Sequence, residues 1–169
     1  MTFKIRAIQP QDNADLAAII RQVLTEFGAN RPGFAWADPE LDTLSEAYSH
    51  KGCIYYVVVQ QQTIIGGAGI APFPCELSGL CELQKMYLLS EHRGLGIGQA
   101  LMAKLLSTAQ ELGYRGCYLE TFDAMQGAMR LYEWFEFKAL PEPLGDSGHT
   151  SCNRFYLHWF NAAGSGFAP

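Results

Sequence analysis

Residues 93 to 99 of this 169-residue chain read Arg93-Gly94-Leu95-Gly96-Ile97-Gly98-Gln99, and this stretch decides the fold. It follows a strand-like run, Leu80 to Leu89, and precedes a segment in which apolar residues recur every three or four positions as far as Leu112. Three glycines in five residues let the backbone turn tightly and bring N–H groups against an anion, where the positive end of a helix dipole adds attraction. We interpret the stretch as a phosphate cradle between a strand and a helix.

Two common phosphate-binding motifs do not match this cradle. A Walker A loop would continue with Gly-Lys-Ser or Gly-Lys-Thr, which is absent here, and the Gly-x-Gly-x-Gly spacing departs from the dinucleotide fingerprint Gly-x-Gly-x-x-Gly. That fingerprint also usually lies in the first βαβ unit, whereas this stretch begins past the middle of the chain. These residues alone leave a second interpretation open, in which the glycines only allow a tight turn and bind no phosphate.

Composition predicts one packed domain. The chain is 49% hydrophobic and only 17% charged, far from the composition of a disordered protein. We expect a domain over residues 1–160 and a short C-terminal tail over residues 161–169. Antiparallel strand patterns come first and strand-helix units later, which is typical of the α+β class with a mixed sheet.

Charge and hydropathy exclude several classes of partner. The net charge is −5 without a Lys/Arg cluster, which argues against nucleic acid. Because no apolar run approaches roughly 18 residues and no signal-peptide pattern opens the chain, we expect no membrane partner and a cytoplasmic location. The five cysteines form no Cys-x-x-Cys pair, which favours reduced thiols and no metal site.

Hydrophobic periodicity places the remaining elements. Asp12, Asp38 and Asp123 are candidate N-caps of helices. The glycine-rich stretch 66–69 marks a bulge, a ligand approach or a loosened strand. The predicted strands are 2–8, 54–60, 64–70, 80–89, 117–121 and 151–160, and the predicted helices follow Asp12, Asp38, Gly96 and Asp123.

Two stretches of the chain resemble signatures of the GNAT N-acetyltransferase family. The strand from Glu82 to Leu89, together with residues 93–101, is similar to that family's acyl-CoA pyrophosphate-binding motif, and residues 128–137 resemble its second signature. The order of elements agrees over about residues 3–160. The resemblance implies a mixed, mostly antiparallel sheet flanked by helices, in which the strand of Glu82 and the parallel strand 117–121 splay apart to form a wedge for CoA.

The same resemblance implies a cofactor site made largely of backbone. The pantetheine would hydrogen-bond along Met86, Tyr87 and Leu88 like an added strand. The pyrophosphate would rest on the backbone amides of Gly94, Leu95, Gly96, Ile97, Gly98 and Gln99. Arg93 either contacts a phosphate or shapes the turn. The chain departs from the family pattern at Glu136, where glycine is usual, and at Met125, where asparagine is frequent.

Two side chains are implied to be catalytic. Glu82 corresponds to the family position that often carries the general base, and the alternative is a solvated charge at the end of a strand. Tyr132 lies near the CoA sulfur in the family and can donate a proton to the departing thiolate, and the alternative is a core position beside Met129 and Phe135. For His149 and Cys152, a capped loop and a small strand residue are favoured over a Cys–His nucleophile.

The implied activity is transfer of the acetyl group of acetyl-CoA to a primary amine of a small molecule, by direct attack and without a metal. Loops 30–37, 72–79 and 140–150 are expected to shape the acceptor pocket. A peptide or protein N-terminal or lysine acetyltransferase stays open as an alternative, as does a non-catalytic acyl-CoA-binding sensor. Homodimers are common in the family, and no residue pattern here decides the oligomeric state.

Overall fold

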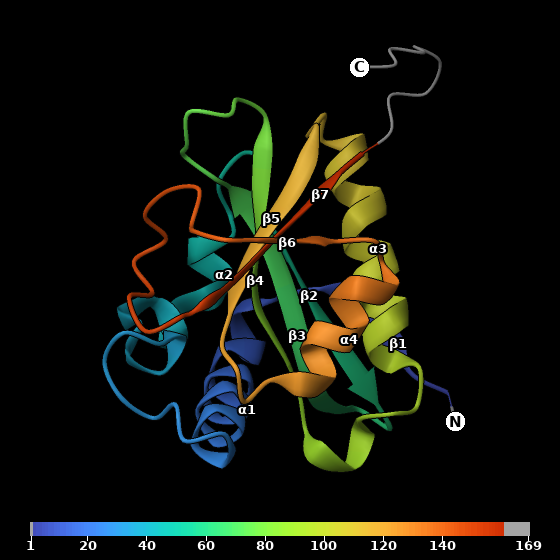
Figure 1. The fold of residues 1–169 in the computed structure, drawn as a ribbon. Helices are drawn as coiled ribbons and strands as arrows, with labels where there is room; N and C mark the ends of the chain where they lie inside the picture. Colours follow the sequence, from blue (N-terminus) through green and yellow to red (C-terminus); the bar gives the residue numbers. More distant parts are fainter. Residues whose placement is uncertain (1, 161–169) are drawn as a thin grey trace.

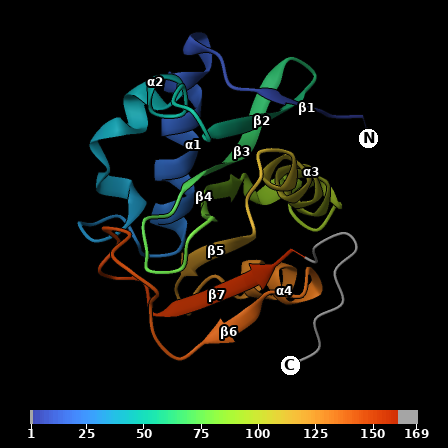
Figure 2. The same ribbon diagram turned by 90° about the horizontal axis from the view of Figure 1, so that it is seen from above.

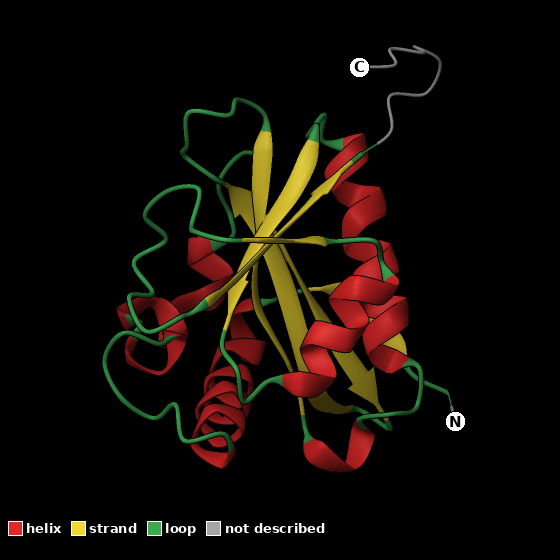
Figure 3. Cartoon of the chain, viewed as in Figure 1, coloured by secondary structure: helices red, strands yellow, loops and turns green. Residues whose placement is uncertain are grey.

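A seven-stranded sheet in the order β1-β2-β3-β4-β5-β7-β6 forms the centre of the computed structural model, which describes residues 2–160 (Figure 1). The neighbouring strands of the described chain pair antiparallel except β4 and β5, which are parallel. The strands are β1 Lys4–Ala7, β2 Ile54–Gln60, β3 Thr63–Pro72, β4 Leu80–Leu88, β5 Gly116–Thr121, β6 Lys138–Leu140 and β7 Arg154–Trp159. The helices are α1 Asn13–Glu26, α2 Leu44–Ala47, α3 Ile97–Glu111 and α4 Gln126–Trp134, as Figure 3 shows.

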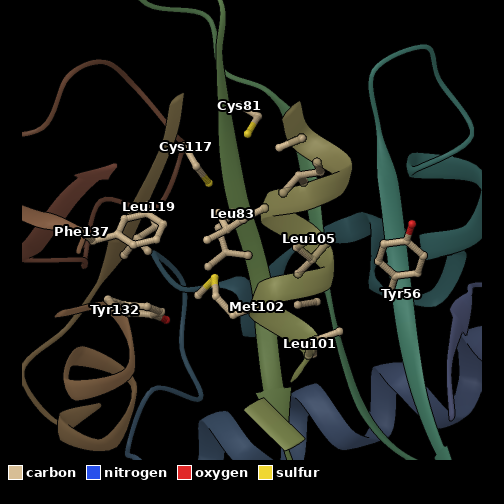
Figure 4. Packing of buried hydrophobic residues seen from close by; sticks show 14 of the residues in the cluster. Tyr56, Cys81, Leu83, Leu101, Met102, Leu105, Cys117, Leu119, Tyr132 and Phe137 are labelled. Carbon is tan, nitrogen blue, oxygen red and sulfur yellow. The ribbon is translucent and has the colours of Figure 1, made fainter. Parts of the chain in front are cut away.

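Helices cover both faces of the sheet. Figure 2 shows α1 and α2 on one face and α3 and α4 on the other. Each face has its own apolar core, because each helix turns one apolar stripe toward the strands. In the core under α3, the side chains of Leu101, Met102 and Leu105 are fully buried and lie near Leu83 of β4 (Figure 4). The predicted mixed α+β architecture is confirmed.

The parallel strands β4 and β5 pair only at their first residues. Within the described residues the pairing runs from Leu80 opposite Gly116 to Glu82 opposite Tyr118. A bulge helps to turn β4 away, because Lys85 and Met86 both stand opposite a single residue of β3. The predicted wedge between the two strands therefore opens just beyond Glu82.

The glycines of β3 serve close packing. The β3–β4 register shifts between Gly67 and Gly69, so the glycine stretch lies opposite a bulge, whose extra residue belongs to β4. A Cβ atom at Gly67 would lie 2.6 Å from the ring of Tyr55, and one at Gly69 would lie 2.6 Å from the ring of Tyr48. Since these rings occupy the space beside the strand, the stretch offers no approach for a ligand.

Two of the three predicted N-cap positions are confirmed: Asp12 is the N-cap residue of α1 and Asp38 that of the 3-10 helix Pro39–Thr43, whereas Met125 and not Asp123 precedes α4. None of the three aspartates caps its helix through its side chain. Asp12 forms an ion pair with Arg6 at 2.6 Å, and Asp123 forms one with Arg154 at 2.6 Å. Charge-assisted hydrogen bonds are about twice as strong as neutral ones, so these carboxylates bind arginines of other elements, and Asp12 also accepts a hydrogen bond from the backbone N–H of Gln9 at 2.8 Å. Asp38 likewise binds a distant cation, described below.

The remaining sequence predictions concern a short strand, the cysteines, membrane spans and the C-terminal tail. The short strand β6 is missing from the prediction, since three residues carry too little periodicity to detect. All five cysteines are free. No helix within residues 2–160 is both long and apolar enough to cross a membrane. The predicted tail, residues 161–169, lies outside the described residues.

Candidate active site

Two hollows meet where β4 leaves β5. The first, which we call the long groove, has an empty volume of ≈ 1450 Å³ and runs between the turn into α3, the end of β4 and α4. The second, which we call the inner pocket, has an empty volume of ≈ 570 Å³ and lies over the middle of β4 and the end of β5. Both volumes include open space at the mouth. Met86, Tyr87 and Met125 line both hollows, so a ligand in one can reach the other.

The turn into α3 forms one end of the long groove. Gly94 and Gly96 have φ angles of +73° and +79°, a left-handed conformation that glycine adopts without strain. Gly96 is the N-cap of α3, and no side chain caps the helix. The first N–H groups of a helix lack partners inside it, so the amides that follow Gly96 are free to bind an anion at the positive end of the helix dipole.

Gly98 lies on the wall of the long groove. A Cβ atom at this position would lie 3.4 Å from Leu131 of α4 and 3.7 Å from Leu88 of β4. A small side chain therefore fits there, but a large one would fill the groove between the two elements.

The other predicted cofactor residues divide into two groups. The side chains or backbone of Met86, Tyr87, Leu88, Arg93 and Gln99 line the long groove. Leu95 and Ile97 do not line it. The side chain of Leu95 is exposed and that of Ile97 is in the core, so either residue can contribute only through its backbone amide.

Arg93 is already engaged by protein groups. Its Nε donates to the carbonyl oxygen of Leu88 at 2.8 Å, and its two terminal nitrogens bind the carboxylate of Glu26 at 2.6 and 2.9 Å. Its guanidinium also lies 5.2 Å from the ring centroid of Phe27. These contacts join the turn to α1 and favour the turn-shaping role among the two that the sequence left open.

Glu82 is buried in the inner pocket. Only 5% of the residue is exposed, which excludes the solvated strand-end alternative. Burial raises the pKa of its carboxyl from 4.5 to about 7, against the hydrogen bond from Gln84 and the positive charges of His149 and Lys85, which lower it. The amide of Gln84 donates to Glu82 Oε2 at 2.6 Å, and the Tyr48 hydroxyl donates to Gln84 Oε1 at 2.8 Å.

Tyr132 belongs to the core and to the pocket at once. Its ring packs beside Phe137 and Tyr156, with centroids 6.1 and 5.9 Å away, and the residue is 5% exposed. It also lines the inner pocket, and Figure 4 shows its hydroxyl at the end of the ring that faces β4. Burial raises the pKa of this phenol, so it stays protonated at neutral pH and can donate a proton.

A charged cluster at the wall of the inner pocket is absent from the sequence prediction. Lys85 Nζ lies 2.6 Å from Asp38 Oδ2 and 3.0 Å from Glu40 Oε1, and its side chain is only 3% exposed. His149 Nε2 lies 3.1 Å from the same Asp38 oxygen. Burial opposes the charge of Asp38, but His149 and Lys85 outweigh it and hold the pKa of Asp38 below its usual value.

The sequence indicates part of this cluster, because Lys85 falls within a predicted strand. The bulge places Lys85 at a φ of +50°, and its side chain reaches the segment of Asp38 and Glu40 although 45 residues separate Lys85 from Glu40. A lysine in a largely buried strand needs a partner, but sequence alone does not say which carboxylate supplies it.

Glu120 and Cys152 complete the polar wall of the pocket. The carboxylate of Glu120 accepts hydrogen bonds from the hydroxyls of Tyr118 and Ser147 at 2.8 and 2.7 Å. Burial raises the pKa of the Cys152 thiol to about 12, and the ring of His149 binds Asp38. A thiol of this kind is not ionised at neutral pH, so the arrangement lacks an activated Cys–His nucleophile.

Two of the three predicted loops close the inner pocket. Phe34 and Ala35 come from loop 30–37, and His149 comes from loop 140–150. The two loops are joined, because the amide of Ser151 donates to the carbonyl oxygen of Gly33 at 3.1 Å. Loop 72–79 supplies none of the lining residues, so its predicted role was wrong.

The arrangement can bring two molecules together. An anionic, elongated ligand fits the long groove, where free amides meet an apolar wall, and a small polar group fits the inner pocket. A carboxyl whose pKa is near 7 and a protonated phenol line the pocket beside the junction. A carboxyl of this kind can accept a proton, and a protonated phenol can donate one.

Comparisons with known proteins agree with this geometry. The family model described as the acetyltransferase (GNAT) family matches residues 19–137. The chain is 41% identical over 149 residues to the protein named Uncharacterized N-acetyltransferase YjgM of Escherichia coli K12, which covers 88% of this chain and 89% of that protein.

Solved structures share the fold. A GNAT-family acetyltransferase from Staphylococcus aureus Mu50 superposes with a TM-score of 0.82 at 24% identity, covering 94% of this chain and 99% of that one. A GNAT-family acetyltransferase from Brucella melitensis, solved in complex with acetyl-CoA, gives a TM-score of 0.65 at 20% identity, over 95% and 90% of the two chains. With the family model and the Escherichia coli relative, these similarities show that the chain belongs to the GNAT acetyltransferase family and is an acyltransferase.

Proposed function

We propose that this protein transfers the acetyl group of acetyl-CoA to a primary amine of a small molecule by direct attack of the amine on the thioester. The observation that carries the proposal is the junction of the two hollows at Met86, Tyr87 and Met125, with Glu82 and Tyr132 both lining the inner one. The long groove would hold the cofactor, and the inner pocket would hold the acceptor.

The residues of the long groove suit CoA. The pyrophosphate would bind the free amides between Gly94 and Gln99, where two left-handed glycines bring the backbone close. The bulged end of β4, from Met86 to Leu88, no longer pairs with β5 and so leaves backbone groups for the pantetheine. The Brucella relative, which has the same fold, was solved with acetyl-CoA.

Glu82 supplies the base. An alkylammonium has a pKa of about 10 and cannot attack until it loses a proton. A carboxylate with a pKa of about 7 accepts that proton far more readily than an exposed glutamate with its pKa of 4.5. Burial of Glu82 therefore tunes the residue toward deprotonating an amine.

Tyr132 supplies the acid. The reaction leaves a thiolate on CoA, which needs a proton, and the phenol of Tyr132 is protonated and lines the pocket next to the junction. Phenol and thiol have ordinary pKa values of about 10 and 8.5, so the transfer must be coupled to breakage of the thioester bond.

The size and charge of the inner pocket favour a small amine over a peptide. The space inside it that can hold water-sized groups is only ≈ 50 Å³, which suits the amino end of an acceptor better than a peptide chain. Glu82 and Glu120 line it, and the cation of Lys85 is already paired with Asp38 and Glu40. A pocket of this charge attracts an ammonium group.

A turnover screen tests the proposal. CoA release from acetyl-CoA is measured over a panel of small amines, amino acids, polyamines, aminoglycosides and peptides, with E82Q and the exposed control variant E76Q. We expect turnover with a small amine, loss of that turnover in E82Q and no change in E76Q. Turnover with peptides alone would replace the acceptor class, and tight acetyl-CoA binding without any turnover would indicate a sensor.

A further inference from the structure

The proposed reaction releases one proton to solvent in each cycle. An acceptor ammonium carries three N–H protons and the amide product keeps one. One of the other two ends on the CoA thiol, and the second must leave the site. If Glu82 takes this proton, it becomes a neutral carboxylic acid and must return to a carboxylate before the next cycle. The argument in this section therefore rests on the function proposed for Glu82.

Glu82 has no direct access to bulk water. It is 5% exposed, and one oxygen is occupied by the amide of Gln84. Behind Gln84 lies Tyr48, which is itself buried, so this side of Glu82 opens no path to solvent. The exit for the proton has to lead across the inner pocket.

His149 lies on that route. It lines the inner pocket with Glu82, and its side chain is 18% exposed, so His149 is more accessible to water than Glu82. Its Nε2 is held by the two oxygens of Asp38 at 3.1 and 3.3 Å, which fixes the ring and leaves Nδ1 without a protein partner among the described residues. A ring held this way offers Nδ1 as a proton acceptor.

The other titratable groups near His149 are less suited to this task. Lys85 is held by two carboxylates, and Asp38 is held by Lys85 and by His149 itself. Both oxygens of Glu120 accept hydrogen bonds from hydroxyl groups, and burial raises the pKa of the Cys152 thiol to about 12.

We propose that His149, positioned by Asp38, is the proton-transfer residue that takes the acceptor's proton from Glu82, directly or through a water molecule, and passes it to solvent. The proton leaves the Glu82 carboxyl, binds His149 Nδ1 to give an imidazolium, and departs to water, so both residues return to their starting states. The hydrogen bond that the His149 ring donates to Asp38 raises the pKa of His149 above its ordinary 6.5, which favours uptake of the proton from Glu82.

The test is chemical rescue in H149A. At pH 7 and low buffer concentration, we expect kcat to fall roughly 10²-fold, the low end of what a proton-transfer group contributes, while the KM for acetyl-CoA stays unchanged. Adding imidazole should restore kcat in proportion to its concentration, because the free base replaces the missing ring. The exposed His50 gives the matched control, and H50A should keep the wild-type rate with no imidazole dependence.

Two further variants separate this proposal from the function on which it rests. E82Q should lose activity without recovery in imidazole, since the first base is then missing. D38N should lower the pKa of His149 and reduce kcat with the fold retained, as checked by circular dichroism. The acceptor is whichever small amine or peptide the screen yields, because both present the same ammonium.

The outcomes are decisive in either direction. Imidazole-dependent recovery of H149A supports the relay. An unchanged kcat in H149A, or a lowered kcat that imidazole does not alter, overturns it while leaving Glu82 as the base. Full activity of E82Q, or no turnover with any amine, overturns the relay and the proposed function together.

Discussion

Replacing Glu82 with glutamine is expected to remove most of the activity and, above pH 7, to stabilise the fold. Glutamine has nearly the same shape as the protonated glutamate and can keep the hydrogen bond from Gln84. It cannot ionise, so the cost of holding a carboxylate in a site that is 5% exposed disappears.

The magnitude follows from the pKa of Glu82. In the unfolded chain the carboxyl titrates near 4.5, whereas in the folded protein burial raises its pKa to about 7. One pKa unit corresponds to about 1.4 kcal/mol, so ionised Glu82 destabilises the fold by about 3 kcal/mol. Between these pH values the native state holds the proton more tightly than the unfolded state. The contribution of Glu82 to the free energy of unfolding is therefore full below pH 4.5 and lost as pH rises through 7.

Urea unfolding at pH 5 and at pH 8 measures this contribution. The difference in the free energy of unfolding between E82Q and the wild type should be small at pH 5 and should reach about 3 kcal/mol in favour of E82Q at pH 8. The same preparations should show turnover about 10² to 10⁴-fold below the wild type. The control E76Q changes a carboxyl in an exposed loop and should show neither effect.

A pH-independent difference would refute this reasoning, because it would mean that Glu82 has the same pKa in the folded and unfolded chains. Burial would then not raise the pKa of Glu82, and the reason given for its role as the base would be lost.

Three further variants test other parts of the site and fold. Y132F keeps the ring in its core position and should retain acetyl-CoA affinity and unfolding free energy while kcat falls at least 10-fold; full kcat would return Tyr132 to a packing role alone. G98L should fill the long groove and weaken acetyl-CoA binding in a calorimetric titration, whereas A103L on the exposed face of α3 should bind normally. E136G should raise the free energy of unfolding by about 1 kcal/mol, because Glu136 has a φ of +62° that glycine adopts without strain; a lower stability would contradict this.

Sequence predicts the parts of this structure that depend on local pattern. The cradle from Gly94 to Gln99, the hairpin of β2 and β3 and the amphipathic helix α3 each carry their signal within a few consecutive residues. The departure at Glu136 was also visible as a charged residue at a turn, and the structure shows the left-handed backbone that makes it unfavourable.

Sequence fails where long-range charges decide the structure. Asp38 precedes a proline and looks like an N-cap, but the buried cation of Lys85 and the ring of His149 bind it more strongly. His149 itself looks like a loop residue, because only the fold brings loop 140–150 beside loop 30–37 and Glu82. The cluster at the wall of the inner pocket therefore could not be derived from residue spacing.

Initial rates measured over a grid of acetyl-CoA and amine concentrations test the central claim most directly. Direct attack within one complex of enzyme, acetyl-CoA and small amine predicts double-reciprocal lines that intersect. Parallel lines would show that the acetyl group passes first to the protein and would contradict the account, because the Cys152 thiol, with its pKa raised to about 12, would then have to be the nucleophile that the geometry argues against.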